Sequence, residues 1–395
     1  MFSARTAWDR TENELARLVA EARASGRRLV DLTESNPTRC NIVDLAPAIA
    51  ELGHPRGAVY EPWSLGHPVA REAVAGHYRA KGYDIDSDHI VITASTSESY
   101  GFLFHLLGDV GDNVLVPQPS YPLFTWLATL GGVRLAPYRL DRNEDWRIDF
   151  DDLERSIDER TRAIVLVHPN NPTGSFIRRE EAEQLEHIAK THGLALVVDE
   201  VFADHGFSDL PADRLPSFVE RDGALTFVLG GLSKALLLPQ CKLGWIVVDG
   251  PPHLVAEALS RLELIADTFL SVSTPVQLAL PALLERHSET VARTLARTEG
   301  NLRALDEALA TLGPESPLRR LPVDGGWYVT LEVPRVHDED GWVELLLEEE
   351  GLHVHPGYFF DFDRDGFLVL SLLPEPEIFA EAVVRLVRRI AREAE

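Results

Sequence analysis

Cysteine, lysine and long apolar runs are scarce in this chain of 395 residues. Its 2 cysteines, Cys40 and Cys241, lie far apart in the sequence and cannot form a disulfide framework, so a reducing cytoplasm is the expected location. No apolar run approaches the roughly 20 residues of a membrane-spanning helix, and the first residues lack the apolar stretch of a signal peptide. We therefore expect neither a membrane protein nor a disulfide-stabilised secreted domain.

Positive charge is also in short supply. The chain has 38 Lys and Arg residues against 63 Asp and Glu, which gives a net charge of −25. Such an acidic chain repels nucleic-acid backbones and anionic lipid, so neither is an expected partner. Hydrophobic residues make up 45% of the chain, which is enough for a sizeable core.

Several motifs that would identify a site are missing as well. The sequence has no G-x-G, G-K-[ST], C-x-x-C, H-E-x-x-H or G-x-S-x-G. His353 and His355 alternate along a predicted strand and could present two imidazoles on one face, but no third ligand accompanies them. A partly exposed strand is therefore a better interpretation of this pair than a metal site.

The order of predicted elements indicates an α/β protein. Between about residues 67 and 275, helical stretches alternate with short apolar runs, a pattern typical of a mainly parallel sheet covered by helices on both faces. After about residue 285 the pattern changes to a smaller α+β unit that ends in an amphipathic helix. We predict a large domain over 46–285 and a small domain built from 1–45 and 286–395.

The 4 lysines fall into two pairs. Lys81 and Lys190 each stand near a glycine at the end of a helical pattern, where a cation interacts favourably with the helix dipole. Lys234 and Lys242 instead lie in an apolar segment rich in glycine. A lysine in such a place is most often a solvated loop end. A lysine near apolar walls, however, loses its charge readily and becomes a nucleophilic amine that can form a Schiff base.

Other polar residues follow neighbouring predicted strands. Asn171 begins an Asn-Pro turn, Asp199 ends an apolar strand, and Ser95 precedes a helix with Glu98 three residues later. Each has a purely structural interpretation: a turn, an ion pair and a capping box, respectively. Because all of them follow strands, they are expected to meet Lys234 at the carboxyl edge of one sheet, where α/β sheets bind ligands.

These motifs, taken in order, resemble a known family. Tyr60, I-T-A-S-T-S, P-S-Y-P, N-N-P-T-G, D-E-V and S-K followed by Lys242-Leu-Gly are similar to the fold-type-I pyridoxal-phosphate enzymes, specifically the class I/II aminotransferases. The resemblance runs from about Leu32 to the C-terminus. Each motif alone is weak to moderate evidence for this family, and the motifs together, in this order, are strong evidence.

The resemblance implies pyridoxal 5'-phosphate as cofactor and assigns two catalytic residues. Lys234 forms the Schiff base and moves a proton during the reaction, and Asp199 pairs with the pyridinium nitrogen so that the ring stays an electron sink. Asn171 bonds the phenolic oxygen, and Tyr121 stacks on the ring. The phosphate ligands that it implies are Ser95, Thr96, Ser97, Ser233 and Lys242.

The resemblance also implies a homodimer with shared active sites. Tyr60 reaches the phosphate bound by the partner subunit. Ser35 and Asn36 lie in the N-terminal loop that borders the carboxylate of the substrate.

The chain departs from the family pattern at four positions. Phe202 stands where a tyrosine is usual, Lys242 replaces an arginine at the phosphate, and Gly231 replaces a hydroxyl residue. Val369 stands where the family carries the arginine that binds the substrate carboxylate.

A buried carboxylate still needs a cation. Arg39, in the same loop as Ser35, is the predicted replacement, and Arg364 is interpreted as a solvated turn residue. We expect an aminotransferase that moves an amino group from an amino acid to a 2-oxo acid. The alternatives are another reaction of the same cofactor, such as β-lysis or decarboxylation, and a non-enzymatic binding relative.

Overall fold

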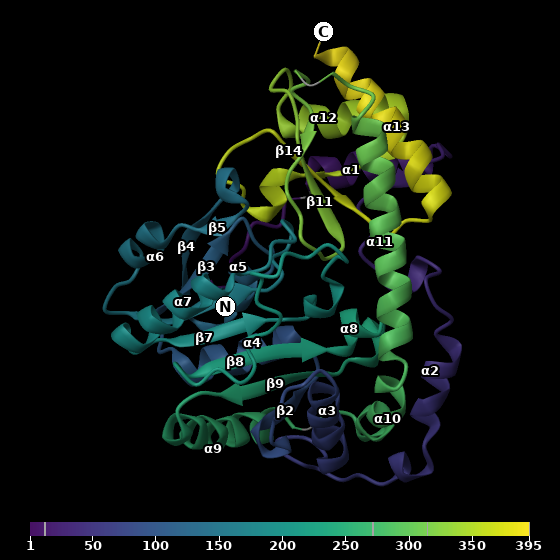
Figure 1. Ribbon diagram of the computed structural model, residues 1–395. Helices are drawn as coiled ribbons and strands as arrows, with labels where there is room; N and C mark the ends of the chain where they lie inside the picture. Colours follow the sequence, from purple (N-terminus) through teal and green to yellow (C-terminus); the bar gives the residue numbers. More distant parts are fainter. Residues whose placement is uncertain (12, 271, 314, 395) are drawn as a thin grey trace.

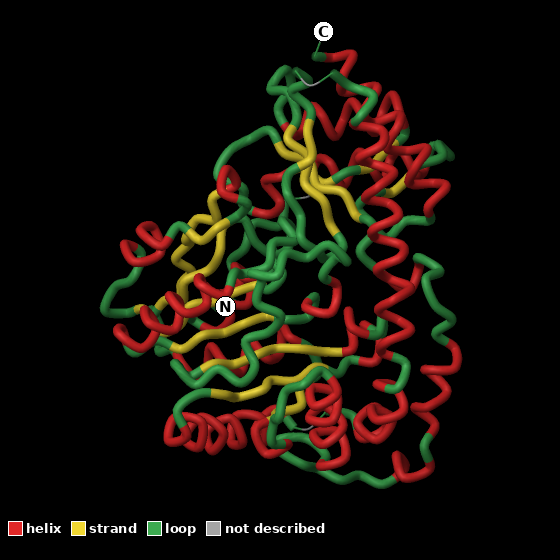
Figure 2. Tube along the Cα trace, viewed as in Figure 1, coloured by secondary structure: helices red, strands yellow, loops and turns green. Residues whose placement is uncertain are grey.

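The computed structural model describes residues 1–395 except 12, 271, 314 and 395. Its strands gather in two places, a large sheet in the lower part of the view and a small sheet above it (Figure 2). The long helix α11 (His287–Leu309) runs along both parts (Figure 1).

The large sheet has eight strands in the order β2-β9-β8-β7-β6-β3-β4-β5. The pairs among β8, β7, β6, β3 and β4 are parallel, whereas β9 runs antiparallel to both of its neighbours and β5 is antiparallel to β4. The strands are β2 (Ile90–Thr93), β3 (Asn113–Gln118), β4 (Arg134–Asp141), β5 (Arg147–Ile148), β6 (Thr161–Val167), β7 (Ala195–Asp199), β8 (Thr226–Gly231) and β9 (Gly244–Asp249). The prediction of a mainly parallel sheet is confirmed.

Helices cover both faces of this sheet, because its central strands are apolar on both sides. One face packs against α4 (Thr96–Leu107), α5 (Phe124–Gly131) and α9 (Pro252–Phe269). The other face packs against α3 (Pro68–Ala80), α6 (Phe150–Arg155), α7 (Arg179–His192) and α10 (Thr274–Leu284).

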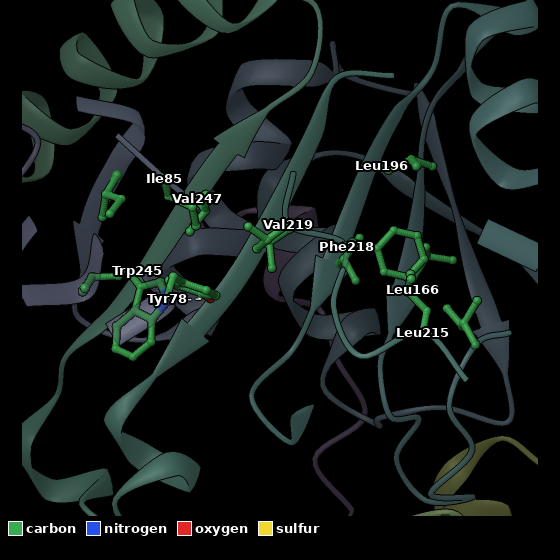
Figure 3. Close-up of a cluster of buried hydrophobic side chains, with 14 of the residues drawn as sticks. Tyr78, Ile85, Leu166, Leu196, Leu215, Phe218, Val219, Trp245 and Val247 are labelled. Atoms are coloured by element: carbon green, nitrogen blue, oxygen red, sulfur yellow. Dashed lines mark hydrogen bonds between the residues drawn. The ribbon is translucent and has the colours of Figure 1, made fainter. Parts of the chain in front are cut away.

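The core on the second face includes a buried polar contact. The Trp245 indole N–H donates to the hydroxyl of Tyr78 at 3.2 Å, so that both rings are buried with their polar atoms paired (Figure 3). Leu166 of β6 and Leu196 of β7 continue the same apolar layer, together with Phe218 from the loop before β8.

The small unit contains the sheet β10-β11-β14-β13, which is antiparallel throughout. Its strands are β10 (Arg319–Arg320), β11 (Tyr328–Glu332), β13 (His355–Pro356) and β14 (Phe367–Ser371). Its helices are α1 (Glu14–Ala24), α12 (Glu339–Leu345) and α13 (Pro376–Glu393), while α2 (Ala46–Ala50) lies near the lower end of α11 (Figure 1). The predicted apolar stripe of α13 is fully buried, and each such side chain contributes about 1.5–3 kcal/mol.

The N-terminal segment joins the C-terminal one through strand pairing. The short strand β1 (Val30–Asp31) pairs in parallel with β12 (Leu352–His353). The segment that was expected to form one strand with two histidines is therefore divided, because His353 belongs to this pair and His355 to the small sheet. The domain limits at residues 45 and 285 remain a prediction.

No helix in the described part of the chain is both long and apolar enough to cross a membrane.

Candidate active site

A cavity lies at the carboxyl edge of the large sheet, and its volume is about 740 Å³ when the solvent-filled space at its mouth is included. Residues at or shortly after the carboxyl ends of five strands, β2, β3, β6, β7 and β8, form its walls. The N-terminal loop and β11 of the small sheet close it from the other side. Its lining includes Ser35, Ser95, Thr96, Tyr121, Asn171, Asp199, Phe202, Ser233, Lys234 and Tyr328.

Lys234 lies in the single-turn helix α8 (Leu232–Ala235), directly after β8. Its Nζ lies 5.3 Å from the centre of the Phe202 ring and 4.7 Å from that of Trp327. Burial lowers the pKa of Lys234 to about 8, although the nearby Asp199 carboxylate favours the charged form. An amine with this pKa is partly neutral near pH 7.5 and can act as a nucleophile.

Asp199 is the last residue of β7 and is buried. The Tyr100 hydroxyl donates to its Oδ2 at 3.2 Å, and the N–H of Val201 donates to its Oδ1 at 3.1 Å. Burial raises the pKa of Asp199 to about 6, and the two hydrogen bonds and Lys234 oppose this shift. A carboxylate held this way suits a cationic ring nitrogen, since the opposite charge would favour its ionised form.

Tyr100 is a site residue that the sequence analysis missed. It lies on the face of α4 that is buried against the sheet, beside Leu103 and Phe104. A buried tyrosine needs a partner for its hydroxyl, and this requirement is the signal that could have identified it. Trp327, which was also missed, has no comparable signal, because only the fold places it next to Lys234.

Asn171 follows β6 and is buried, and its Oδ1 has no hydrogen-bond partner among the described residues. A buried amide left unpaired is costly, so this atom indicates a polar ligand group in the cavity. Its neighbour Asn170 has a structural role instead. It accepts from the N–H and the hydroxyl of Thr173 and thereby holds the turn.

The N-terminus of α4 opens into the cavity through Ser95 and Thr96. Ser95 Oγ accepts the N–H of Glu98 at 3.2 Å, and the Glu98 side chain accepts the N–H of Ala94 at 2.6 Å. The structural interpretation of Ser95 as a cap is thus correct. The free N–H groups of this helix end are still suited to an anion.

Five predicted site residues do not line the cavity. Ser97 is one position further along α4, and Asn36 uses its side chain to cap the helical turn Pro37–Arg39. Lys242 is exposed and has a left-handed backbone with φ of 52°, and Tyr60 is 69% exposed. The Arg39 side chain is 74% exposed, and its nearest carboxylate oxygen, on Glu34, is 3.9 Å away.

Val369 is fully buried in an apolar cluster with Phe202, Trp327, Tyr328 and Phe360. The cluster separates it from solvent and leaves no cation at this position.

Arg364, which was interpreted as solvated, is instead bound. Its guanidinium forms an ion pair with Glu332 and lies 4.5 Å from the centre of the Phe367 ring. The expectation of a free turn residue was wrong, because the turn folds back over β11 and β14.

Comparison with known proteins gives consistent matches over nearly the whole chain. The family described as aminotransferase class I and II matches residues 27–386. An alanine aminotransferase of Mycobacterium tuberculosis is 30% identical over 378 residues, which cover 93% of this chain and 86% of that protein. A mouse (Mus musculus) tyrosine aminotransferase is 27% identical over 80% of this chain and 70% of its own.

Solved structures match equally broadly. An alanine aminotransferase from Pyrococcus furiosus superposes with a TM-score of 0.88 over 99% of this chain and 100% of that chain, at 24% identity. An aspartate aminotransferase from Thermus thermophilus gives a TM-score of 0.84 at 25% identity, covering 98% of this chain and 99% of that one.

Proposed function

The chain belongs to the class I and II aminotransferases, enzymes that depend on pyridoxal phosphate, and from this we propose that the cavity around Lys234 is its active site. The observation that carries the proposal is the convergence of a half-buried amine, a buried carboxylate and an unpaired buried amide, from Lys234, Asp199 and Asn171, on one cavity.

The residues fit pyridoxal phosphate in three respects. Asp199 offers a buried negative charge to the ring nitrogen, and the Asn171 side-chain amide can donate from Nδ2 to the phenolic oxygen, while its unpaired Oδ1 is left to accept from a donor group of the ligand. Ser95, Thr96 and Ser233 offer hydroxyl and backbone N–H groups to the phosphate. When bound, the cofactor supplies an electron sink for the charge left behind when a proton leaves the substrate α-carbon.

Lys234 is proposed to bear the cofactor and afterwards to move that proton. Its pKa of about 8 lets the amine accept a proton and give it back near neutral pH. The aromatic rings of Phe202 and Trp327 lie on two sides of Nζ, and burial lowers the pKa of the amine to about 8, so that part of it is neutral near pH 7.5.

Reduction with borohydride followed by peptide mapping tests the assignment. We expect the pyridoxyl group on Lys234, loss of the label in Lys234→Ala, and retention of the label in the matched variant Lys242→Ala. A label on Lys242, or no label on any lysine, would contradict the proposal.

The family implies an amino acid and a 2-oxo acid as substrates. Relatives named for alanine and for tyrosine both match this chain. A screen of amino donors with pyruvate or 2-oxoglutarate as acceptor identifies the donor. Product analysis then distinguishes transamination, which yields an oxo acid and a new amino acid, from β-lysis, which releases ammonia.

We propose Arg39 as the cation for the substrate carboxylate. Ser35, in the same loop, lines the cavity, and the exposed Arg39 side chain makes only a long contact with Glu34, so it is available to a substrate anion.

We also propose a homodimer with shared sites and a cytoplasmic location. The exposed Tyr60 supports the first, and the two buried, unbridged cysteines support the second.

A further inference from the structure

A second group of potential ligand side chains lies on the far side of the segment that carries Asp199. His77 is in α3, Asp204 is in the helical turn Ala203–His205, and His287 is the first residue of α11. One ligand atom from each lies within 4.8 Å of the others, and among the described residues this is the one such group. We propose that His77, Asp204 and His287 bind a divalent transition-metal ion such as Zn²⁺.

The geometry brings the three side chains to one point. Asp204 Oδ2 lies 2.8 Å from His287 Nε2, and the rings of His77 and His287 are 4.4 Å apart at an interplanar angle of 79°. The three residues come from three separate elements, namely α3, the helical turn Ala203–His205 and α11. Two imidazoles and a carboxylate are a ligand set for Zn²⁺ and its neighbours rather than for Mg²⁺ or Ca²⁺.

Access and the remaining coordination position are provided by a cavity. His77, Lys81 and Asp204 line a cavity of about 790 Å³, measured with its opening. The side chains of Asp204 and His287 are 19% and 14% exposed, so an ion can enter and keep a water molecule as its further ligand.

Lys81 is the competitor for this site. Its Nζ is 2.5 Å from Asp204 Oδ1, so that an ammonium neutralises the carboxylate where a metal ion would bind. The Lys81 side chain is 29% exposed and flexible, so it can swing into solvent when an ion arrives. Metal binding is therefore expected to be weakened by Lys81 and strengthened by its removal.

The site is linked to the active site through one residue. His205 follows Asp204, and its Nε2 donates to the carbonyl of Lys234 at 3.3 Å. An ion on Asp204 would thus tie α3 and α11 to the segment that holds the backbone of Lys234.

The test uses the protein loaded with pyridoxal phosphate, stripped of metal by a chelator and titrated with Zn²⁺ by calorimetry and with Co²⁺ by visible absorbance. We expect one ion per chain, loss of binding in His77→Ala and His287→Ala, and tighter binding in Lys81→Met. His187→Ala, which removes an exposed histidine of α7, is the matched control and should bind like the unmodified chain.

Absence of stoichiometric binding in both the unmodified chain and Lys81→Met would overturn the proposal. Unchanged binding in His287→Ala would also overturn it. If an alanine variant misfolds, as judged by circular dichroism, His287→Gln removes the ligand while keeping a side chain that can hydrogen-bond to Asp204. Unchanged binding in that variant would count against the site.

Discussion

Burial of Asp199 in the folded protein disfavours the ionised form of its carboxyl group. Burial raises its pKa from 3.8 to about 6, so without the cofactor the folded protein keeps a proton that the unfolded chain releases near pH 4. The contribution of Asp199 to stability is therefore fully present below pH 3.8 and is lost as the pH rises through about 6. A cationic ring nitrogen bound beside Asp199 would favour the ionised carboxylate and so would couple cofactor binding to stability.

We predict that Asp199→Asn stabilises the cofactor-free protein at pH 7 while weakening the activity of the loaded enzyme. The difference between the folded and unfolded pKa of Asp199 corresponds to about 3 kcal/mol. The free energy of unfolding of Asp199→Asn should therefore rise by about this amount, relative to that of the unmodified chain, between pH 4 and pH 7. Urea unfolding of both proteins across this range measures the difference. Asp151→Asn, at an exposed position of α6, is the control and should show no such trend. A difference that does not change with pH would contradict the prediction.

The second prediction at the residue scale concerns the substrate carboxylate. Because Val369 provides no charge, Arg39→Ala is expected to weaken amino-acid binding about tenfold or more while the cofactor remains bound. Spectral titration of the loaded enzyme with amino acids measures this.

Arg364→Ala is the matched control, because its guanidinium is already paired with Glu332. It should leave amino-acid affinity nearly unchanged. If Arg39→Ala binds amino acids normally, and amines without a carboxylate react equally well, the enzyme is built for a substrate that lacks the α-carboxylate.

At the scale of elements, the turn after β6 is fixed to the segment that leads into β11. Gly174 has φ of +69°, and a Cβ there would lie 2.3 Å from the carbonyl oxygen of Gly325. The N–H of Asp324 also donates to the carbonyl of Gly174 at 3.2 Å. The glycine of N-N-P-T-G therefore permits a close backbone approach that positions Asn171 against the small sheet.

Gly174→Ala is predicted to lower the free energy of unfolding by about 3 kcal/mol or more, because a left-handed conformation and a backbone overlap add together. Gly193→Ala separates the two causes. Gly193 has φ of +66°, but a Cβ added to it would meet no atom within 4 Å, so this variant should lose only about 1–2 kcal/mol. Urea unfolding compares them, and equal losses would show that the overlap is relieved without cost.

At the scale of the whole molecule, apolar side chains remain exposed around Tyr60. Trp63 in the same loop, and Leu264 and Phe269 on α9, are exposed, and the Ser64 hydroxyl donates to Asp267 at 3.1 Å, which joins loop and helix. A patch of this kind marks an interaction surface, and a second copy of the chain is the proposed partner.

Mixed dimers test whether Tyr60 acts across that interface. Tyr60→Ala and Lys234→Ala subunits, each impaired alone, are expected to regain activity when mixed and re-equilibrated, because one site then combines Lys234 with Tyr60 of the partner subunit. Random mixing in equal amounts should restore up to about a quarter of the wild-type sites. Activity equal to the sum of the two separate variants would contradict a shared site.

The mainly parallel sheet and the meeting of several polar residues in one cavity could be predicted from the order of residues along the chain, whereas the division of the predicted strand between His353 and His355 could not. Apolar runs of strand length mark the buried strands, and chain connectivity then forces Ser95, Asn171, Asp199 and Lys234 to one edge. The family assignment followed from the order of these motifs, which is a one-dimensional property.

The contacts between side chains far apart in the sequence could not be predicted in this way. Tyr100 reaches Asp199, Trp327 covers Lys234, and Arg364 folds back onto Glu332. The same is true of His77, Asp204 and His287. No periodicity links such residues, because their contacts arise where separate elements pack, and the packing depends on the whole core rather than on any local pattern.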